Sequence, residues 1–346
     1  ARTPKLFIKF CLERELIYVW TKSFWSTFWA KDVKLKNTPK HNEMTIFFIF
    51  NIFYKDTILS KINISKYVLY YYICSNLNRM KKVVLITGGS SGIGKRVGEY
   101  LNDKGFIVYG TSRNPENVKN SKIKLVALDV RDSESIKKAV HHIIETEKRL
   151  DVLINNAGVG ITGPLEEIPT DEIRNNFETN VFGPIEVMKA VLPQMRLQKS
   201  GLIINVTSIA GYMGLPFRSV YSSSKGALEI LTEAIRMEVK SFGIQITNVA
   251  PGDFATDIAS RRFHAPVIKN SPYEKVYSQQ LATIDEHVND GNDPIEMAEA
   301  IYKIINTNNP KVHYKVGAFM QKFSIFLKRI LPDTVYEKML MNHYKL

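Results

Sequence analysis

The sequence predicts an α/β fold in which a doubly wound parallel sheet carries helices on both faces. Two observations lead to this prediction. From residue 82 to residue 250, short apolar runs alternate with helical stretches, and no internal repeat is apparent. The first apolar run is followed by a glycine-rich turn that opens a helix, as in sheets that bind nucleotides. The chain from Met80 onward is long enough for one large domain of this kind.

The first predicted strand is the β-branched run 83–86, and the glycine-rich turn 87–94 follows it. Glycines in such a turn let the backbone approach a pyrophosphate at a helix N-terminus, where free N–H groups favour anions. The spacing T-G-x-x-x-G-x-G departs from G-x-G-x-x-G, so a plain tight turn is the alternative. The turn residues predicted to contact a cofactor are Gly88, Ser90, Ser91, Gly92, Ile93 and Gly94.

The end of the second predicted strand, residues 106–113, indicates which nicotinamide dinucleotide would bind. NAD(H) sites of this architecture usually carry an acid here, whereas an arginine matches the geometry of a 2′-phosphate. Thr111, Ser112 and Arg113 offer two hydroxyls and a guanidinium, so NADP(H) is favoured and NAD(H) stays possible. The alternative is a surface arginine in the turn that contains Asn114.

The apolar runs 124–128 and 152–154 predict two further strands whose ends would border the same groove. Asp129 would contact the cofactor, although Asp129 or Asp132 could instead cap the helix predicted for residues 133–148. A bare turn is the alternative after the second run. The residues that these two strand ends contribute are Asp129, Val130, Asn156, Ala157 and Gly158.

A serine, a tyrosine and a lysine carry the clearest chemical signal. Ser208 ends an apolar run that predicts a buried strand, and Tyr221 and Lys225 lie four residues apart on the next helix. Residues at this spacing share a helix face, so the ammonium can sit beside the tyrosine ring and a nucleotide ribose. A nearby cation favours the phenolate of a group whose pKa is ordinarily about 10, which suits proton exchange with an alcohol or ketone. An isolated Tyr-x-x-x-Lys pair would more often be a chance surface pair.

Taken together, these motifs resemble the short-chain dehydrogenase/reductase family, and the resemblance covers residues 80–317. All of them occur in the family's order. Asn180 precedes Ser208 by 28 residues, which agrees with the family pattern and completes an Asn-Ser-Tyr-Lys tetrad. The resemblance implies a Rossmann-type sheet of about seven strands in the order 3-2-1-4-5-6-7.

The resemblance also implies a role for each residue of the tetrad. Tyr221 would be the general acid in reduction and the general base in oxidation. Lys225 would lower the pKa of Tyr221 and bond the nicotinamide ribose, and Ser208 would hold the substrate oxygen. Asn180, in a helix predicted for residues 172–195, would hold a water that links Lys225 to solvent, or it is an ordinary polar helix residue. The residues implied at the nicotinamide are Pro251, Gly252 and Thr256.

The segment 253–293 follows the cofactor groove and is long, charged and aromatic, which predicts a substrate lid. Its length is closer to the hydroxysteroid and retinol dehydrogenase branch of the family than to the ketoacyl reductases of fatty-acid synthesis. A helix at residues 294–306 and a last strand at residues 312–316 are predicted to follow.

The resemblance therefore implies an NADP(H)-dependent oxidoreductase that interconverts an alcohol and a ketone or aldehyde on a steroid-, retinoid- or lipid-like substrate. Two alternatives are a 3-oxoacyl-thioester reductase and a non-catalytic NADP-binding regulatory protein. The complete tetrad argues against the regulatory protein, because binding alone needs neither Ser208 nor the Tyr221 hydroxyl. Family members are commonly dimers or tetramers, which implies a homo-oligomer.

In the C-terminal tail, residues 318–346, apolar side chains recur at helical spacing among Lys322, Lys328 and Arg329. A basic amphipathic helix of this kind can lie on a membrane surface. Alternatively, the apolar stripe packs on the domain, covers the substrate mouth or joins a subunit interface. The stripe consists of Phe319, Phe323, Phe326, Leu327 and Ile330.

Residues 1–79 differ in composition from the rest, with no glycine and 17 of the 37 aromatic residues. Their residue types favour A/T-rich codons, so we expect translated upstream sequence or a disordered extension, with Met80 beginning the native protein. A membrane anchor is the competing interpretation. Its apolar stretches, residues 45–54 and 67–74, are each too short for a helix to cross about 30 Å of hydrocarbon, and no clean secretory signal is present.

The charge balance points away from nucleic acid as a partner. Residues 1–79 carry +8 of the formal net charge of +13, and no recognition motif accompanies this excess. Both cysteines, Cys11 and Cys74, lie in the same segment, so no disulfide framework is expected and a cytoplasmic location is the default. The seven histidines are scattered, and we expect no metal site.

Overall fold

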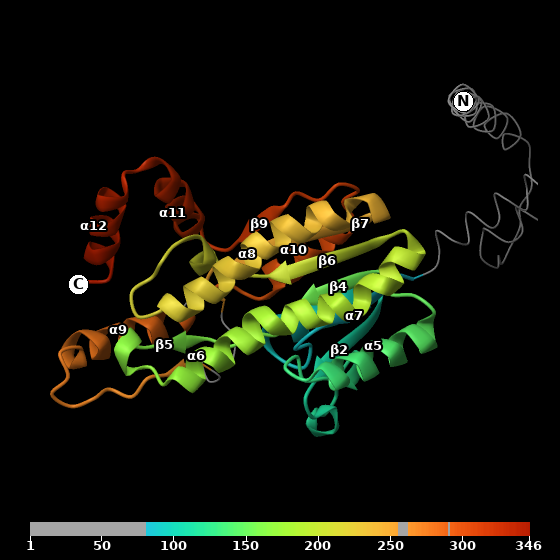
Figure 1. Cartoon of the computed structure of the whole chain (residues 1–346), viewed down its shortest axis with the longest axis horizontal. Coiled ribbons are helices and arrows are strands. Elements are labelled where there is room, and N and C mark those ends of the chain that lie inside the picture. The colour runs from blue at the N-terminus through green and yellow to red at the C-terminus, as the bar shows by residue number, and fades with distance from the viewer. Residues whose placement is uncertain (1–80, 255–261, 290) are drawn as a thin grey trace, which may run out of the picture. The chain divides into compact units, whose positions relative to one another are not determined.

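The structure is a computed structural model and describes residues 81–254, 262–289 and 291–346. The expectations for residues 1–79 and for Thr256 lie outside the described residues. Within the described ranges, helices and parallel strands alternate along the chain (Figure 1).

Seven parallel strands form the main sheet in the order β3-β2-β1-β4-β6-β7-β9, which confirms the predicted strand order. Hydrogen-bonded neighbours run in the same direction throughout, and the order reverses between β1 and β4. A small second sheet pairs β5 (Ile161–Thr162) with β8 (Phe263–His264). The strands of the main sheet are β1 Val83–Ile86, β2 Ile107–Ser112, β3 Lys124–Ala127, β4 Val152–Asn155, β6 Gly201–Val206, β7 Ile244–Pro251 and β9 His313–Val316.

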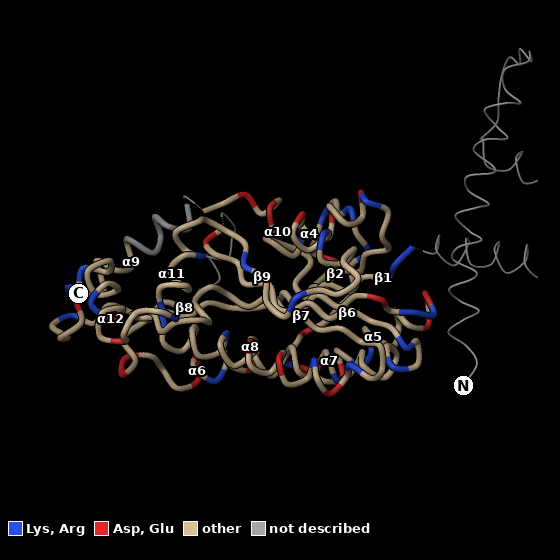
Figure 2. The backbone as a smooth tube through the Cα atoms, turned by 90° about the horizontal axis from the view of Figure 1, so that it is seen from above, with Lys and Arg blue, Asp and Glu red and all other residues tan. Residues whose placement is uncertain are grey.

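Helices cover both faces of this sheet, as predicted. The helices α5, α7 and α8 lie on one face, and α4 and α10 lie on the other (Figure 2). These helices are α4 Gly92–Asp103, α5 Ser133–Glu147, α7 Gly183–Gln198, α8 Ser219–Val239 and α10 Ile295–Ile305. Short 3₁₀ segments connect elements at η2 Pro115–Asn117, η3 Leu165–Glu167, η5 Ile209–Tyr212 and η6 Lys240–Phe242.

The apolar runs of the strands follow from this two-sided cover. In β1, Val83 and Leu85 belong to the cluster under α5 and α7, whereas Val84 and Ile86 belong to the cluster under α4 and α10. All four side chains are fully buried. Alternate side chains of a strand point to opposite faces, so a sheet covered on both sides needs continuous apolar strands.

The helix predicted over residues 172–195 is not continuous. It consists of α6 (Thr170–Phe177), a π-helical turn η4 (Glu178–Phe182) and α7. Single π-turns inside helices are frequent at functional sites, and here the turn carries Asn180. Helical periodicity predicts the helix but not the inserted residue, because one wide turn leaves the apolar pattern nearly unchanged.

The C-terminal part of the chain packs against the domain. The segment expected to form a lid contains β8 and α9 (Glu274–Asn289), and α11 (Phe319–Ile330) and α12 (Asp333–His343) follow β9. Ile325 and Tyr336 are buried against Met213 and Ala250 near the end of β7. None of the helices in the described ranges is long and apolar enough to cross a membrane.

We predict that Ile203→Ala in β6 lowers the free energy of unfolding by about 2–5 kcal/mol, because its side chain is 0% exposed and its removal leaves a cavity. Chemical denaturation of both proteins measures the difference. Ile230→Ala on α8 is the matched control, since that side chain is 70% exposed and should cost roughly 0.5 kcal/mol or less. Equal losses in the two variants would contradict the assignment of Ile203 to the core.

Candidate functional site

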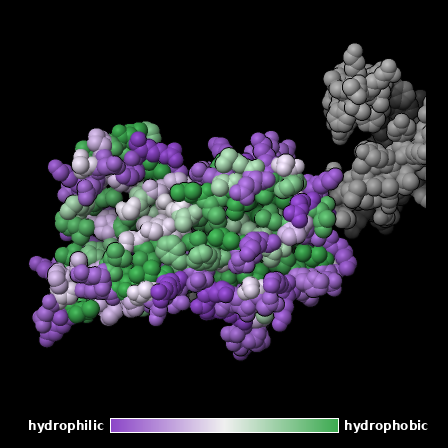
Figure 3. Space-filling view, in the orientation of Figure 1, coloured by the Kyte–Doolittle hydropathy of each residue, from purple (hydrophilic) through white to green (hydrophobic). Residues whose placement is uncertain are grey.

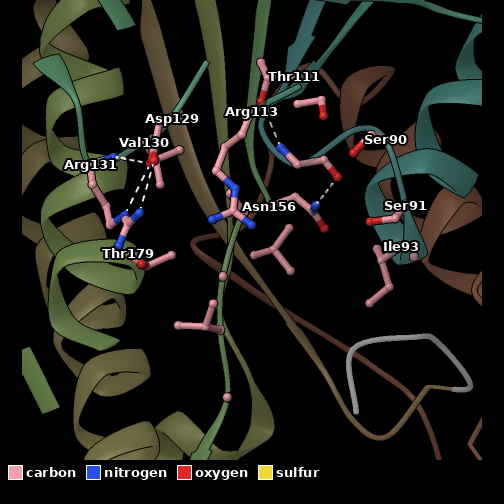
Figure 4. Close-up of a pocket in the computed structure, with 18 of the residues that line it drawn as sticks. Ser90, Ser91, Ile93, Thr111, Arg113, Asp129, Val130, Arg131, Asn156 and Thr179 are labelled. Atoms are coloured by element: carbon pink, nitrogen blue, oxygen red, sulfur yellow. Dashed lines mark hydrogen bonds and ion pairs between the residues drawn. The ribbon is translucent and has the colours of Figure 1, made fainter. Parts of the chain in front are cut away.

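A cavity of about 840 Å³ lies at the carboxyl ends of six strands, β1, β2, β3, β4, β6 and β7 (Figure 4). These strands flank the reversal of order between β1 and β4, which is where open parallel sheets bind their ligands. Most of the residues predicted from the motifs line it. Five do not belong to that lining: Gly94, Asn180, Ser208 and Gly252 lie outside it, and Thr256 lies outside the described residues.

The glycine-rich turn forms one wall of the cavity between β1 and α4. Gly88 and Gly92 have φ angles of +66° and +54°, a conformation that favours glycine. A Cβ atom on Gly94 would lie 2.5 Å from Asn156 Nδ2, so the helix can pack this closely only with glycine there. The side chain of Ser91 makes no capping bond at the N-terminus of α4. The turn residues that line the cavity are Gly88, Ser90, Ser91, Gly92 and Ile93.

Hydrogen bonds connect this turn to the neighbouring strand ends. Thr87 Oγ1 accepts from the backbone N–H of Asn156 at 2.9 Å and from that of Ala157 at 3.0 Å. Asn156 Nδ2 donates back to Thr87 O at 3.0 Å. The Gly88 N–H donates to Thr111 Oγ1 at 3.0 Å, so this buried hydroxyl braces the turn. Asn156, Ala157 and Gly158 thus reach the cavity wall through bonds that also hold β1 beside β4.

Basic side chains lie at the ends of β2 and β3. Arg113 projects among the lining side chains, beside Asp129 and Val130 (Figure 4). Asp129 pairs with Arg131, whose Nη2 lies 3.2 Å from Asp129 Oδ2. Burial alone would raise the pKa of Asp129, but its hydrogen bonds with Arg131 and the charge of Arg113 leave that pKa below its ordinary value.

Of the two candidates for the cap of α5, Asp129 and Asp132, the structure shows that Asp132 is the cap. Its carboxylate caps α5 by accepting from the backbone N–H groups of Glu134 at 2.9 Å and Ser135 at 3.3 Å. Asp129 lines the cavity instead. Sequence reasoning missed Arg131, which also lines the cavity. Its position two residues after Asp129, at the end of a predicted strand, could have indicated a second arginine beside Arg113.

Lys225 is buried at the inner end of the cavity, with 5% of its surface exposed. Its Nζ donates to Val206 O at 3.0 Å. A Cβ atom on Gly158 would lie 3.3 Å from this Nζ, so a glycine leaves the ammonium accessible from the cavity. Burial lowers the pKa of Lys225 to about 8, and the charge of Glu229 acts in the opposite direction.

Tyr221 lies one helical turn before Lys225 and lines the same cavity. Its hydroxyl is hydrogen-bonded to Ser208, the residue that caps η5 after β6. Burial raises the pKa of Tyr221, and the bond with Ser208 acts against this rise. The cations that further lower the pKa are Arg262 and Arg218, which the sequence did not single out, rather than the expected Lys225.

Asn180 is fully buried in the π-turn, and its amide pairs with the backbone of Val159. Asn180 Oδ1 accepts from Val159 N at 2.9 Å, and Nδ2 donates to Val159 O at 2.9 Å. Nδ2 also lies 3.2 Å from Ser224 Oγ on α8. These contacts fix the strand end beside the cavity, and a Cβ atom on Gly158 would lie 3.1 Å from Asn180 Oδ1. The predicted role of Asn180 in holding a water stays a prediction.

A smaller cavity of about 40 Å³ adjoins Tyr221 on the side of the lid segment. Arg218 and Arg262 line it together with Tyr221. The side chain of Arg262 rests on Gly160, where an added Cβ atom would lie 2.9 Å from Arg262 Nε. Sequence reasoning placed Arg262 only in a charged lid, because nothing local indicates that β8 returns to β5 beside Tyr221.

Of the two described residues predicted to lie at the nicotinamide, Pro251 and Gly252 at the end of β7, only one lines the cavity. Pro251 lines the large cavity. Gly252 packs against Gln321 of α11, which occupies the space that a Cβ atom would need, and its N–H donates to Val316 O at 2.8 Å. Gln321 Nε2 donates to Asp253 Oδ2 at 2.7 Å, so α11 is anchored directly behind this strand end.

The arrangement fits a dinucleotide and the chemistry of a carbonyl group. The glycine turn leaves a cradle at the N-terminus of α4, where N–H groups favour a pyrophosphate, and Arg113 supplies a cation nearby. A hydroxyl pair beside a buried ammonium can exchange a proton with an oxygen placed against it. Within the described ranges, no group of histidine, cysteine or acidic side chains could hold a metal ion.

Comparisons with known proteins agree with this site. The family described as short chain dehydrogenase matches residues 82–266. A 3-ketodihydrosphingosine reductase of Bacteroides thetaiotaomicron is 40% identical, covering 76% of this chain and 98% of the relative. An NADPH-dependent 3-dehydrocapnine reductase of Ornithobacterium rhinotracheale is 30% identical, covering 76% and 98%.

A solved structure leads to the same family. The structure of a short-chain dehydrogenase from Streptomyces avermitilis superimposes with a TM-score of 0.64 at 30% identity, covering 76% of this chain and 97% of that one. The family match covers more than half of the 346 residues. The chain belongs to the short-chain dehydrogenase/reductase family of oxidoreductases.

Proposed function

We propose that this protein is an NADP(H)-dependent oxidoreductase that interconverts an alcohol and a ketone on a lipid-like substrate. The observation that carries the proposal is the pair of hydrogen-bonded hydroxyls, Tyr221 and Ser208, beside the buried Lys225 at the inner end of a dinucleotide-sized cavity. A protein that only binds a nucleotide has no need for this hydroxyl pair, so the pair supports turnover over regulation.

In the proposed reduction, the bound nicotinamide supplies the hydride that goes to the carbonyl carbon. The Tyr221 hydroxyl gives its proton to the carbonyl oxygen, and the reverse transfer makes Tyr221 the base in oxidation. Ser208 donates a hydrogen bond to the same oxygen and keeps it within reach of Tyr221. The charges of Arg262 and Arg218 favour the phenolate that remains, and the Lys225 ammonium would bond the nicotinamide ribose.

Positive charge around the adenosine end supports NADP(H) as the preferred cofactor. Arg113 lines the cavity, and Arg131 joins it there while paired with Asp129. A guanidinium matches a 2′-phosphate, whereas the acid typical of NAD(H) sites is absent at the end of β2, residues 107–112. The relative named as an NADPH-dependent 3-dehydrocapnine reductase supports the same preference.

The surroundings of Tyr221 support an apolar substrate. Its ring packs against a cluster from the lid and the neighbouring loops, in which Ile161, Val220 and Tyr277 are buried. The hydroxyl of Tyr277 lies 3.2 Å from Thr162 O on β5, which anchors this segment beside the site. Two relatives are named as reductases of 3-ketodihydrosphingosine and 3-dehydrocapnine, which favours a long-chain ketone.

We further propose that α11 lies on an anionic membrane surface and brings the active site to its lipid substrate. Phe319 is 72% exposed and Phe326 is 53% exposed, and both lie roughly 100–120° around the helix from the buried Ile325. Hydrophobic side chains gather at the outer end of the α11–α12 hairpin (Figure 3). Lys322 and Arg329 share one flank of this stripe, which suits anionic headgroups.

A cytoplasmic location and homo-oligomeric assembly stay predictions. The described part of the chain contains no cysteine, which agrees with a reducing compartment. Size-exclusion chromatography with light scattering tests the assembly.

We predict that Tyr221→Phe keeps the affinity for NADPH but loses at least about a thousandfold in kcat, because the proton donor is removed. The measurement is NADPH oxidation with 3-ketodihydrosphingosine, steroid ketones, retinal, medium-chain aldehydes and acetoacetyl thioesters. Tyr100→Phe, whose ring packs against Tyr302 and does not line the cavity, is the matched control and should retain most activity. Wild-type kcat in Tyr221→Phe would remove this residue from the chemistry.

We predict that Arg113→Ala raises the KM for NADPH at least about tenfold and leaves the KM for NADH nearly unchanged, because only NADPH carries the 2′-phosphate. Steady-state kinetics with both cofactors measure the two constants. Arg96→Ala on the exposed side of α4 is the control for a lost positive charge. Equal changes for NADPH and NADH would reject Arg113 as the phosphate ligand.

We predict that exchanging Phe319 and Phe326 for Gln lowers binding to phosphatidylglycerol-containing vesicles at least about tenfold in cosedimentation. Turnover of a short, water-soluble ketone should not change. Leu197→Gln, an exposed apolar residue on α7, is the control. A fall in oligomer size with unchanged vesicle binding would instead assign the α11 stripe to an interface between copies of the chain.

A further inference from the structure

Glu229 is a buried carboxylate that the proposed reaction does not yet use. It lies four residues after Lys225 on α8, and each of the two is only 5% exposed. Residues at this spacing share one face of a helix, so the carboxylate sits one turn deeper than the ammonium. An ionisable side chain at this depth is costly unless it is paired or hydrogen-bonded.

Four donors from four different elements surround this carboxylate. Glu229 Oε2 accepts from Tyr212 OH at 2.9 Å, from Asn248 Nδ2 at 2.9 Å and from His313 Nδ1 at 2.7 Å. Glu229 Oε1 accepts from Thr207 Oγ1. An acceptor-only side chain matches this set of donors, so the pocket is built for the ionised form of Glu229.

The network reaches the surface through the histidine. His313 Nε2, on β9, lies 2.9 Å from the exposed Glu233 Oε1, one further turn along α8. A neutral imidazole can donate to only one of these two carboxylates, whereas an imidazolium donates to both. Lys225, Glu229, His313 and Glu233 therefore follow one another from the cavity to solvent along α8 and β9.

We propose that Glu229 is a positioning residue that keeps Lys225 in its ammonium form at the active site. The inference rests on the proposed function, because it assigns Glu229 a role through Lys225. The geometry carries it: the carboxylate is fixed by four donors and cannot swing away from the lysine one turn above it.

The direction of the effect follows from the charges. Burial lowers the pKa of Lys225 to about 8, and Glu229 opposes that fall. Without the carboxylate the pKa would fall further, so Lys225 would lose its proton at a lower pH. NADPH binding and carbonyl reduction, which use the ammonium, should then fail earlier as the pH rises.

Other titratable groups face Glu229 from neighbouring elements. Burial and the charge of Glu229 raise the pKa of Tyr212, which therefore stays a donor. Lys315 on β9 has a pKa lowered by burial and by the charge of Arg329, while Glu229 acts to raise it. Lys315 and Arg329 add positive charge near Glu229, and neither of them lines the cavity with Lys225.

The test is Glu229→Gln, which keeps the shape and the acceptor oxygen but removes the charge. We expect the alkaline limit of kcat/KM, and that of NADPH affinity measured by fluorescence, to move down by about one pH unit. Glu229→Asp, which restores the charge, should recover most of the shift. An unchanged alkaline limit in folded Glu229→Gln would overturn the inference.

Two controls separate this effect from loss of structure. Glu238→Gln removes the same charge from the exposed part of α8 and should leave both limits unchanged. His313→Asn removes a donor but keeps the carboxylate, so its alkaline limit should stay at or above the wild-type value even if Glu229→Gln does not fold. A downward shift in His313→Asn would contradict the proposed direction.

The two proposals can fail separately. Should the wild-type protein reduce none of the ketones, the proposed activity fails, but the pH dependence of NADPH affinity still tests Glu229. Should turnover be normal and both pH limits be equal in wild type and Glu229→Gln, only the role of Glu229 is lost.

Discussion

The junction between the ends of β1 and β4 is the constraint on which the site depends. Thr87 accepts from two backbone N–H groups after β4, and Asn156 donates back to the backbone after β1. These bonds hold together the ends of two neighbouring strands, and the strand order reverses between them, which is where open parallel sheets form a groove. The glycine turn and Gly158 then keep this groove free of side chains.

Helix α8 contributes the ionisable side chains of the groove, and these side chains are evenly spaced along the helix. Tyr221, Lys225, Glu229 and Glu233 follow one another at four-residue steps, so a single face of the helix passes from the cavity to the surface. Burial of this helix face lowers the pKa of Lys225 and raises that of Tyr221. The same packing that stabilises the sheet thus sets the protonation of the groups that would perform the reaction.

The segment after β7 and the C-terminal helices extend the sheet scaffold beside Tyr221 and the end of β7. The small sheet of β5 and β8 brings Arg262 to the side of Tyr221, and α9 fills the space behind it with Tyr277. Gln321 connects α11 to Asp253 beside the cavity. Tyr221 therefore has apolar side chains and two arginines, Arg218 and Arg262, on this side.

The sequence by itself determined the glycine turn and the Tyr221–Lys225 pair, because each depends on residues close together in the chain. These motifs in their order indicated the family, and only that resemblance implied the strand order. The structure alone decided that Arg218 and Arg262 flank Tyr221, that a π-turn carries Asn180, and that His313 meets Glu229 across 84 residues. It also turned the apolar stripe of α11 outward, although that spacing fits a buried face equally well. Periodicity identifies the faces of a helix, but only packing against the rest of the chain decides which face is covered.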